Sequence, residues 1–110
     1  MATNKVPDVF GRLQRRHGEL MAAAEAVGQA ARRAGPLDER QIQLIQLAAA
    51  AAIRSEGAVH SHTRRALAAG ASPEEIRHAL IVLVSTIGFP CAVAATSWAD
   101  DVLEAKAPPG

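Results

Sequence analysis

The chain has 110 residues, a formal net charge of +1, and 49% apolar residues. This length accommodates one domain with one core, and the apolar content excludes general disorder. The nearly balanced charge, with two phenylalanines, one tryptophan and no tyrosine, argues against nucleic-acid binding, because neither a basic surface nor stacking side chains are available.

Alanine accounts for 25 of the residues. It is the strongest helix former, but its small side chain buries little surface. A core built from alanine would be thin in an isolated monomer. We therefore expect contacts between subunits to supply part of the stability.

The sequence also indicates a compartment. A single cysteine, Cys91, excludes an internal disulfide and is typical of a reducing cytoplasm. Residues 1–7 are polar and lack the apolar stretch of a signal peptide. The apolar run over residues 48–53 is far shorter than the roughly 20 residues that span a bilayer. We expect a soluble, cytoplasmic protein that has no membrane partner.

The first predicted element is a helical segment over residues 7–33, where apolar residues recur at helical spacing. Gly18 and Gly28 weaken this segment and leave room for a break inside it. Pro36, which follows a glycine, ends it. These residues make up an N-terminal helical segment.

The second helix is predicted to begin after Asp38, with Gln41 three residues later as the partner in a capping box. It extends to residue 53, and its apolar positions cover most of its circumference, as in a buried helix. A third helix covers residues 58–69 and ends at Gly70, a favourable residue for a helix C-terminus.

The strongest local signal is the start of the fourth helix, where Ser72 is followed by Pro73 and by Glu75. This helix is predicted to continue until Gly88. It is apolar on all sides, so nearly every face must be covered, which is a second argument for oligomerisation. A last helix starts at Pro90, and no alternating strand pattern is found.

Three stretches carry a family resemblance. Residues 37–53 resemble the long helix that begins the core of the carboxymuconolactone decarboxylase and AhpD-like family. Residues 62–76 resemble its most characteristic segment, a histidine followed by an alanine-rich turn, a glycine and a capped helix with Glu-Glu-Ile. Residues 88–90 are similar to the Gly-x-Pro entry to the last core helix.

The resemblance implies an all-α, compact AhpD-like domain of five to six helices that forms helical homo-oligomers, commonly trimers or hexamers. We divide the chain, as one domain overall, into an N-terminal helical segment (1–36), a core of the carboxymuconolactone decarboxylase kind (37–106) and a disordered tail (107–110). A small molecule is the expected substrate, if the protein is an enzyme.

The resemblance does not extend to the family's thiols. In the AhpD-like branch a Cys-x-x-Cys pair precedes the histidine. Alignment on His62 places Ser55 and Ala58 at those two positions, and Gln43 at the position of an assisting acidic residue. Peroxide reduction needs a thiolate and a resolving thiol, and Cys91 has no intramolecular partner. Cys91 is expected to be a packing residue, and the family's peroxidase activity is disfavoured.

The densest cluster of functional side chains contains Glu56, His60 and His62. On a helix Glu56 and His60 share a face, so the carboxylate can orient the imidazole. His60 and His62 point roughly 200° apart and cannot chelate one ion. His78 could approach either of them only through tertiary packing. We expect neither a metal site nor a cofactor.

Three hypotheses for the function follow. In the first, the chain is a cofactor-free lyase or isomerase in which His62 transfers protons, Glu56 and His60 assist, and Arg54 and Arg65 hold the carboxylate of a small substrate. The second is the AhpD-like peroxidase, or antioxidant, that the family implies. The third is a non-catalytic binding or assembly module, in which His62 is a hydrogen-bonded structural residue.

Overall fold

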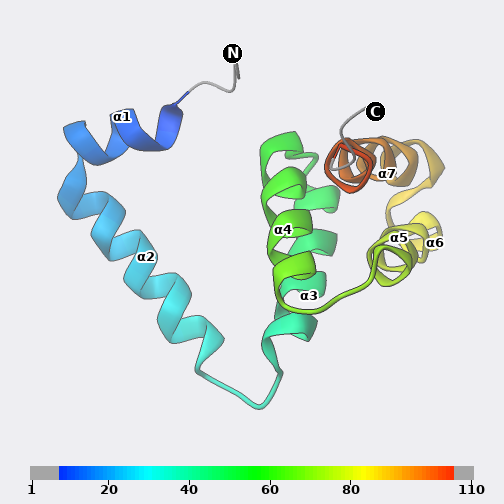
Figure 1. Cartoon of the computed structure of the whole chain (residues 1–110), viewed down its shortest axis with the longest axis horizontal. Coiled ribbons are helices and arrows are strands. Elements are labelled where there is room, and N and C mark those ends of the chain that lie inside the picture. Colours follow the sequence, from blue (N-terminus) through cyan, green and yellow to red (C-terminus); the bar gives the residue numbers. More distant parts are fainter. Residues whose placement is uncertain (1–7, 106–110) are drawn as a thin grey trace. The chain divides into compact units, whose positions relative to one another are not determined.

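The computed structural model describes residues 8–105, which form seven helices and no strand (Figure 1). Six of them have eight residues or more and the seventh is a single turn, so the predicted all-α class is confirmed. The chain divides between Pro36 and Leu37 into two compact units. The predicted tail over residues 107–110 lies outside the described residues, as do residue 106 and the predicted helix start at residue 7.

The first unit contains α1 (Val9–Arg16) and α2 (Gly18–Arg32). Asp8 caps α1, because its Oδ1 accepts a hydrogen bond from the Gly11 amide at 3.0 Å. The predicted single segment is interrupted at His17, whose φ of −139° is not helical. This break lies beside Gly18, one of the two glycines that weaken the predicted segment. Neither helix contains a buried residue.

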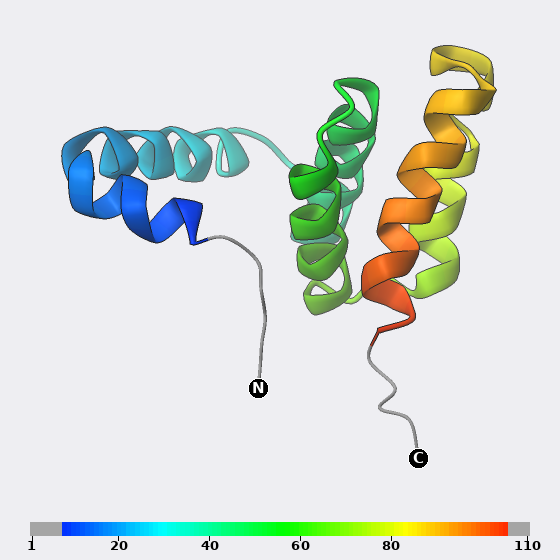
Figure 2. The same ribbon diagram turned by 90° about the horizontal axis from the view of Figure 1, so that it is seen from above.

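The second unit consists of two layers of helices, which are visible from two directions (Figures 1 and 2). α3 and α4 pack against each other in one layer, and α5 and α7 form the other, with α4 against α7 and α3 against α5. The bounds are α3 (Glu39–Ala52), α4 (Glu56–Ala68), α5 (Pro73–Ile81), α6 (Val84–Ile87) and α7 (Phe89–Leu103).

The core lies between these layers and is rich in alanine. Its larger apolar side chains without solvent exposure are Leu47, Val59, Ile76 and Leu80. The remaining buried cluster is completed by Ala50, Ala51, Ala66, Ala71, Ala95, Ala99 and Leu103. Small side chains allow the helices to approach closely, but each contributes little buried apolar area.

Both predicted capping boxes are present. Asp38 Oδ1 accepts from the Gln41 amide at 2.8 Å, and Gln41 Oε1 accepts from the Asp38 amide at 3.0 Å. Ser72 and Glu75 form the equivalent pair at the start of α5, with distances of 3.0 and 2.9 Å. These caps satisfy amides that a helix N-terminus would otherwise leave unpaired.

The link between α3 and α4 positions the site. Arg54 has φ +58°, the left-handed conformation that glycine usually takes at the end of a helix. The Ser55 amide donates to Ala50 O at 3.0 Å and the Arg54 amide to Ala51 O at 3.1 Å, which completes a Schellman motif. Ser55 Oγ then caps α4 by accepting from the Ala58 amide at 3.3 Å. α4 therefore begins two residues before its predicted start.

The predicted helix from Ser72 to Gly88 is broken. α5 ends at Ile81. A turn follows before α6, closed by hydrogen bonds between residues three apart, such as the bond from the Leu83 amide to Leu80 O at 3.1 Å. The β-branched residues here have lower helix propensity because a helix restricts their side chains. Ile81 and Val82 are 49% and 52% exposed, so the single chain does not cover every apolar face of the predicted helix.

None of the helices over residues 8–105 combines the length and the apolar character needed to cross a membrane.

Candidate functional site

His62 is held by a chain of hydrogen bonds that joins α4 to α3. His62 Nδ1 lies 2.8 Å from Gln43 Oε1, and Gln43 Nε2 donates to Glu39 Oε2 at 2.7 Å. Gln43 is only 1% exposed. A carboxylate accepts but does not donate, so the Gln43 amide nitrogen must face Glu39 and its oxygen must face the ring. His62 Nδ1 is therefore the donor, and in the neutral ring Nε2 keeps a free lone pair.

The surroundings of His62 favour the neutral ring. Partial burial lowers its pKa, and the Arg65 guanidinium lowers it further by repelling the charged form. The ring is half-buried, so part of it remains open to solvent. The result is an oriented imidazole with an unprotonated Nε2, which is the form that a general base requires.

The two arginines proposed for substrate binding are placed differently. Arg65 follows His62 by one helical turn and acts on it electrostatically. Arg54 is an exposed residue of the α3–α4 link, and its side chain makes no hydrogen bond or ion pair with any other described residue. Arg65 is thus the cation that accompanies the candidate site.

The positions of the family's thiols have structural roles here. Ser55 is the N-cap of α4, and Ala58 packs against the apolar core. Cys91 is 6% exposed, and its Sγ donates to Ala51 O at 3.5 Å across the α3–α7 contact. The lone thiol is therefore a buried packing group. Gln43, which aligns with the family's acidic residue, contacts His62.

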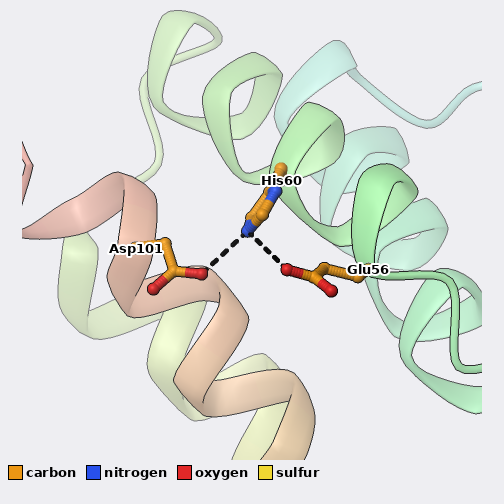
Figure 3. A group of neighbouring side chains, drawn as sticks. All are labelled: Glu56, His60 and Asp101. Atoms are coloured by element: carbon orange, nitrogen blue, oxygen red, sulfur yellow. Dashed lines mark hydrogen bonds and ion pairs between the residues drawn. The ribbon is translucent and has the colours of Figure 1, made fainter. Parts of the chain in front are cut away.

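A second polar group lies on another side of α4 and contains His60, Glu56 and Asp101 (Figure 3). His60 Nε2 is 3.0 Å from Asp101 Oδ2 and 3.9 Å from Glu56 Oε2. Glu56 and His60 thus share a helix face, as their spacing indicates. His60 contacts α7 whereas His62 contacts α3, so the two rings do not converge.

Sequence reasoning missed two carboxylates of these groups. Asp101 is 41 residues from His60, and only the packing of α7 on α4 brings it there. Glu39 had a usable signal, because it precedes Gln43 by one turn of a predicted helix, where side chains are neighbours. His78 is exposed on α5 and joins neither group.

Known proteins support the family assignment. The family model described as the carboxymuconolactone decarboxylase family matches residues 18–101. This match begins at the first residue of α2, well before the resemblance noted from residue 37. No protein in a search of curated proteins matches the chain.

Among solved structures, the chain is similar to the crystal structure of apo-lpg0406, a carboxymuconolactone decarboxylase family protein from Legionella pneumophila. The TM-score is 0.74 and the sequence identity 26%, over 84% of this chain and 86% of that chain. The chain belongs to the carboxymuconolactone decarboxylase family.

Proposed function

We propose that this chain is a cofactor-free lyase or isomerase in which His62 transfers protons to and from a small substrate that carries a carboxylate or carbonyl group. The observation that carries the proposal is the hydrogen-bonded chain from Glu39 through Gln43 to His62 Nδ1. Among the described residues, His62 forms its hydrogen bond with Gln43, and the bond from Gln43 to Glu39 fixes how that amide is turned. Here a buried amide and a carboxylate together fix the tautomer and leave Nε2 free to react.

The same chain supports the charged state that proton transfer creates. When Nε2 accepts a proton, the imidazolium donates from Nδ1 to Gln43 Oε1, and the Glu39 carboxylate polarises that amide from its other end. Glu39 and Gln43 are thus positioning residues. In a decarboxylation, Nε2 first takes up a proton from solvent; the carbon–carbon bond then breaks, carbon dioxide leaves, and the electron pair left on carbon takes that proton, which returns the ring to its neutral form.

Arg65 suits the role of substrate holder. A guanidinium pairs well with a carboxylate, and Arg65 is close enough to His62 to lower its pKa. A substrate carboxylate bound to Arg65 would neutralise that repulsion and raise the pKa of His62, so that the ring becomes a stronger base once substrate is present. This coupling links binding to proton transfer.

A thiol peroxidase is the weaker alternative. Its chemistry needs two nearby thiols, and the positions that would carry them hold Ser55 and Ala58. Cys91 is buried between α3 and α7, where peroxide has little access.

Release of carbon dioxide from carboxymuconolactone, the compound in the family's name, tests the proposal. We expect wild-type turnover and a roughly 10²- to 10⁴-fold lower kcat for His62→Asn, the usual range for loss of a general acid or base. His78→Asn is the matched control, because this histidine is exposed on α5 and joins neither polar group. Absence of turnover by the wild-type chain, or full activity of His62→Asn, would contradict the proposal.

The positioning role has its own signature. Glu39→Gln should lower kcat but leave KM nearly unchanged, because Glu39 contacts Gln43 and acts on the ring only through it. Arg65→Gln should instead raise KM, because it removes the proposed contact to the substrate carboxylate. Equal changes in KM for both variants would argue against this division of roles.

We also propose that the chain assembles into a homo-oligomer, for which the family resemblance suggests a trimer or hexamer. An exposed apolar stripe on α3 and its C-cap residue supports this, formed by Ile45, Ala49, Ala52 and Ile53. Ile45 and Ile53 are 54% and 73% exposed. A second copy of the chain would cover this stripe and supply the area that an alanine-rich core lacks.

A further inference from the structure

The polar group between α4 and α7 is independent of His62 and its hydrogen bonds. Glu56 Oε2, His60 Nε2 and Asp101 Oδ2 all lie within 4.8 Å of one another, and both carboxylates point toward the His60 ring nitrogen (Figure 3). We propose that these three side chains bind one divalent transition-metal ion, with Zn²⁺ as the best fit, in a site that bridges α4 and α7.

The distances are close to those that a metal ion needs. Zinc binds nitrogen and oxygen ligands at about 2.0–2.2 Å, which places neighbouring ligands of a tetrahedral site about 3.4 Å apart. The separations from His60 Nε2 are 3.0 Å to Asp101 and 3.9 Å to Glu56. Both carboxylate side chains are 57% exposed, so they can rotate by the small amounts required. A water molecule would take the fourth position.

The net charge of the group also favours the binding of a cation. Two carboxylates converge on one imidazole, which carries at most one positive charge. Over residues 8–105, neither Glu56 nor Asp101 has an arginine within 4.0 Å. Arg77 instead pairs with Asp100 at 3.0 Å and with Glu104 at 3.5 Å. The group therefore retains negative charge in either state of His60, and a divalent ion would neutralise it.

The ligand types select the class of ion. One imidazole nitrogen with two carboxylate oxygens suits borderline divalent ions, of which zinc accepts a compact four-coordinate site. Magnesium prefers an octahedral shell of oxygens and gives up its water reluctantly. We therefore expect Zn²⁺ to bind and Mg²⁺ not to.

Titration calorimetry with zinc chloride tests the proposal on the full chain, after treatment with a chelator and its removal. We expect one Zn²⁺ per chain and a higher melting temperature in its presence. Glu56→Gln and Asp101→Asn replace exposed carboxylates with amides of the same shape, so the fold should be kept, as circular dichroism can verify. Loss of an outer-shell partner alone costs about 10- to 100-fold in metal affinity, so each variant should lose at least about tenfold.

Three histidine variants locate the ion, and two of them are controls. His60→Asn should abolish the calorimetric signal, whereas His78→Asn, at an exposed position of α5, should leave it unchanged. His62→Asn should also leave it unchanged, because His62 faces α3. The proposal is overturned if wild type shows no zinc-dependent heat or melting shift. It is also overturned if Glu56→Gln and Asp101→Asn bind zinc like wild type, or if His62→Asn abolishes binding.

Discussion

Replacement of Gln43 by glutamate would test the hydrogen-bonded chain at its centre. The substitution Gln43→Glu places a carboxylate oxygen where the amide nitrogen now donates to Glu39 at 2.7 Å. Two unit charges at that distance repel by about 6 kcal/mol at an effective dielectric constant of about 20. The protein has cheaper responses. Protonation of one carboxyl at about pH 7 costs about 4 kcal/mol, and rotation of the exposed Glu39 away costs one hydrogen bond, about 1 kcal/mol.

The cheapest response sets the expected effect. Gln43→Glu should lower the free energy of unfolding by at least about 1–2 kcal/mol, because a carboxylate at this buried position also loses hydration. This corresponds to a fall in melting temperature of at least roughly 5 °C for a domain of this size. Addition of Glu39→Gln should restore most of the loss, because a donor again faces the carboxylate. Urea denaturation followed by far-UV circular dichroism measures the four states of this double-mutant cycle.

Glu74→Gln provides the matched control, since Glu74 is also an acidic residue in the first turn of a helix and shares the favourable dipole interaction that Glu39→Gln removes. It should not rescue Gln43→Glu. If Gln43→Glu is as stable as wild type, or if Glu39→Gln brings no recovery, the Glu39–Gln43 contact does not hold the site and the proposed positioning role fails.

Three further predictions concern backbone, pH and assembly. Arg54→Gly should raise the melting temperature by a few degrees, because relief of about 1–2 kcal/mol of left-handed strain exceeds the entropy cost of glycine; a lower value in thermal melts would refute the strain. Because burial and Arg65 lower the pKa of folded His62 below 6.5, the unfolded chain binds more protons. The contribution of neutral His62 to the free energy of unfolding is therefore complete above about pH 6.5. It is lost as the pH falls through the lowered pKa of the folded state. Urea titrations across this range, in chelator-containing buffer, should show a flatter dependence for His62→Asn; an equal slope would assign the effect elsewhere. Light scattering should show smaller particles for the double variant Ile45→Glu/Ile53→Glu than for wild type, and a monomeric wild type would contradict the assembly proposal.

Features encoded by neighbouring residues could be predicted from the sequence. The two capping boxes, begun by Asp38 and Ser72, depend on side chains three residues apart. The pairing of Glu56 with His60 depends on a spacing of four. Such signals need only local helical geometry, and this is why the all-α class and most helix starts were predictable.

Features that depend on tertiary packing could not be predicted. Asp101 joins His60 only because α7 packs on α4. The apolar pattern predicts that the helix continues past Ile81, whereas the β-branched residues there have weak helix propensity. The sequence does not show which of the two effects is stronger. Arg54 takes a left-handed conformation where glycine is the usual residue, and nothing in the arginine itself signals this.

The cap on α4 bears on how this chain could change over generations. In the related branch a cysteine stands where Ser55 accepts a hydrogen bond from the Ala58 amide. A mutation to cysteine there would remove a favourable helix cap, at a cost of about 1 kcal/mol, and a single thiol would give no dithiol chemistry in return. The first step toward a dithiol peroxidase would thus be a stability loss without a gain in activity. The cap at Ser55 would therefore oppose the first of the two substitutions that a dithiol site requires.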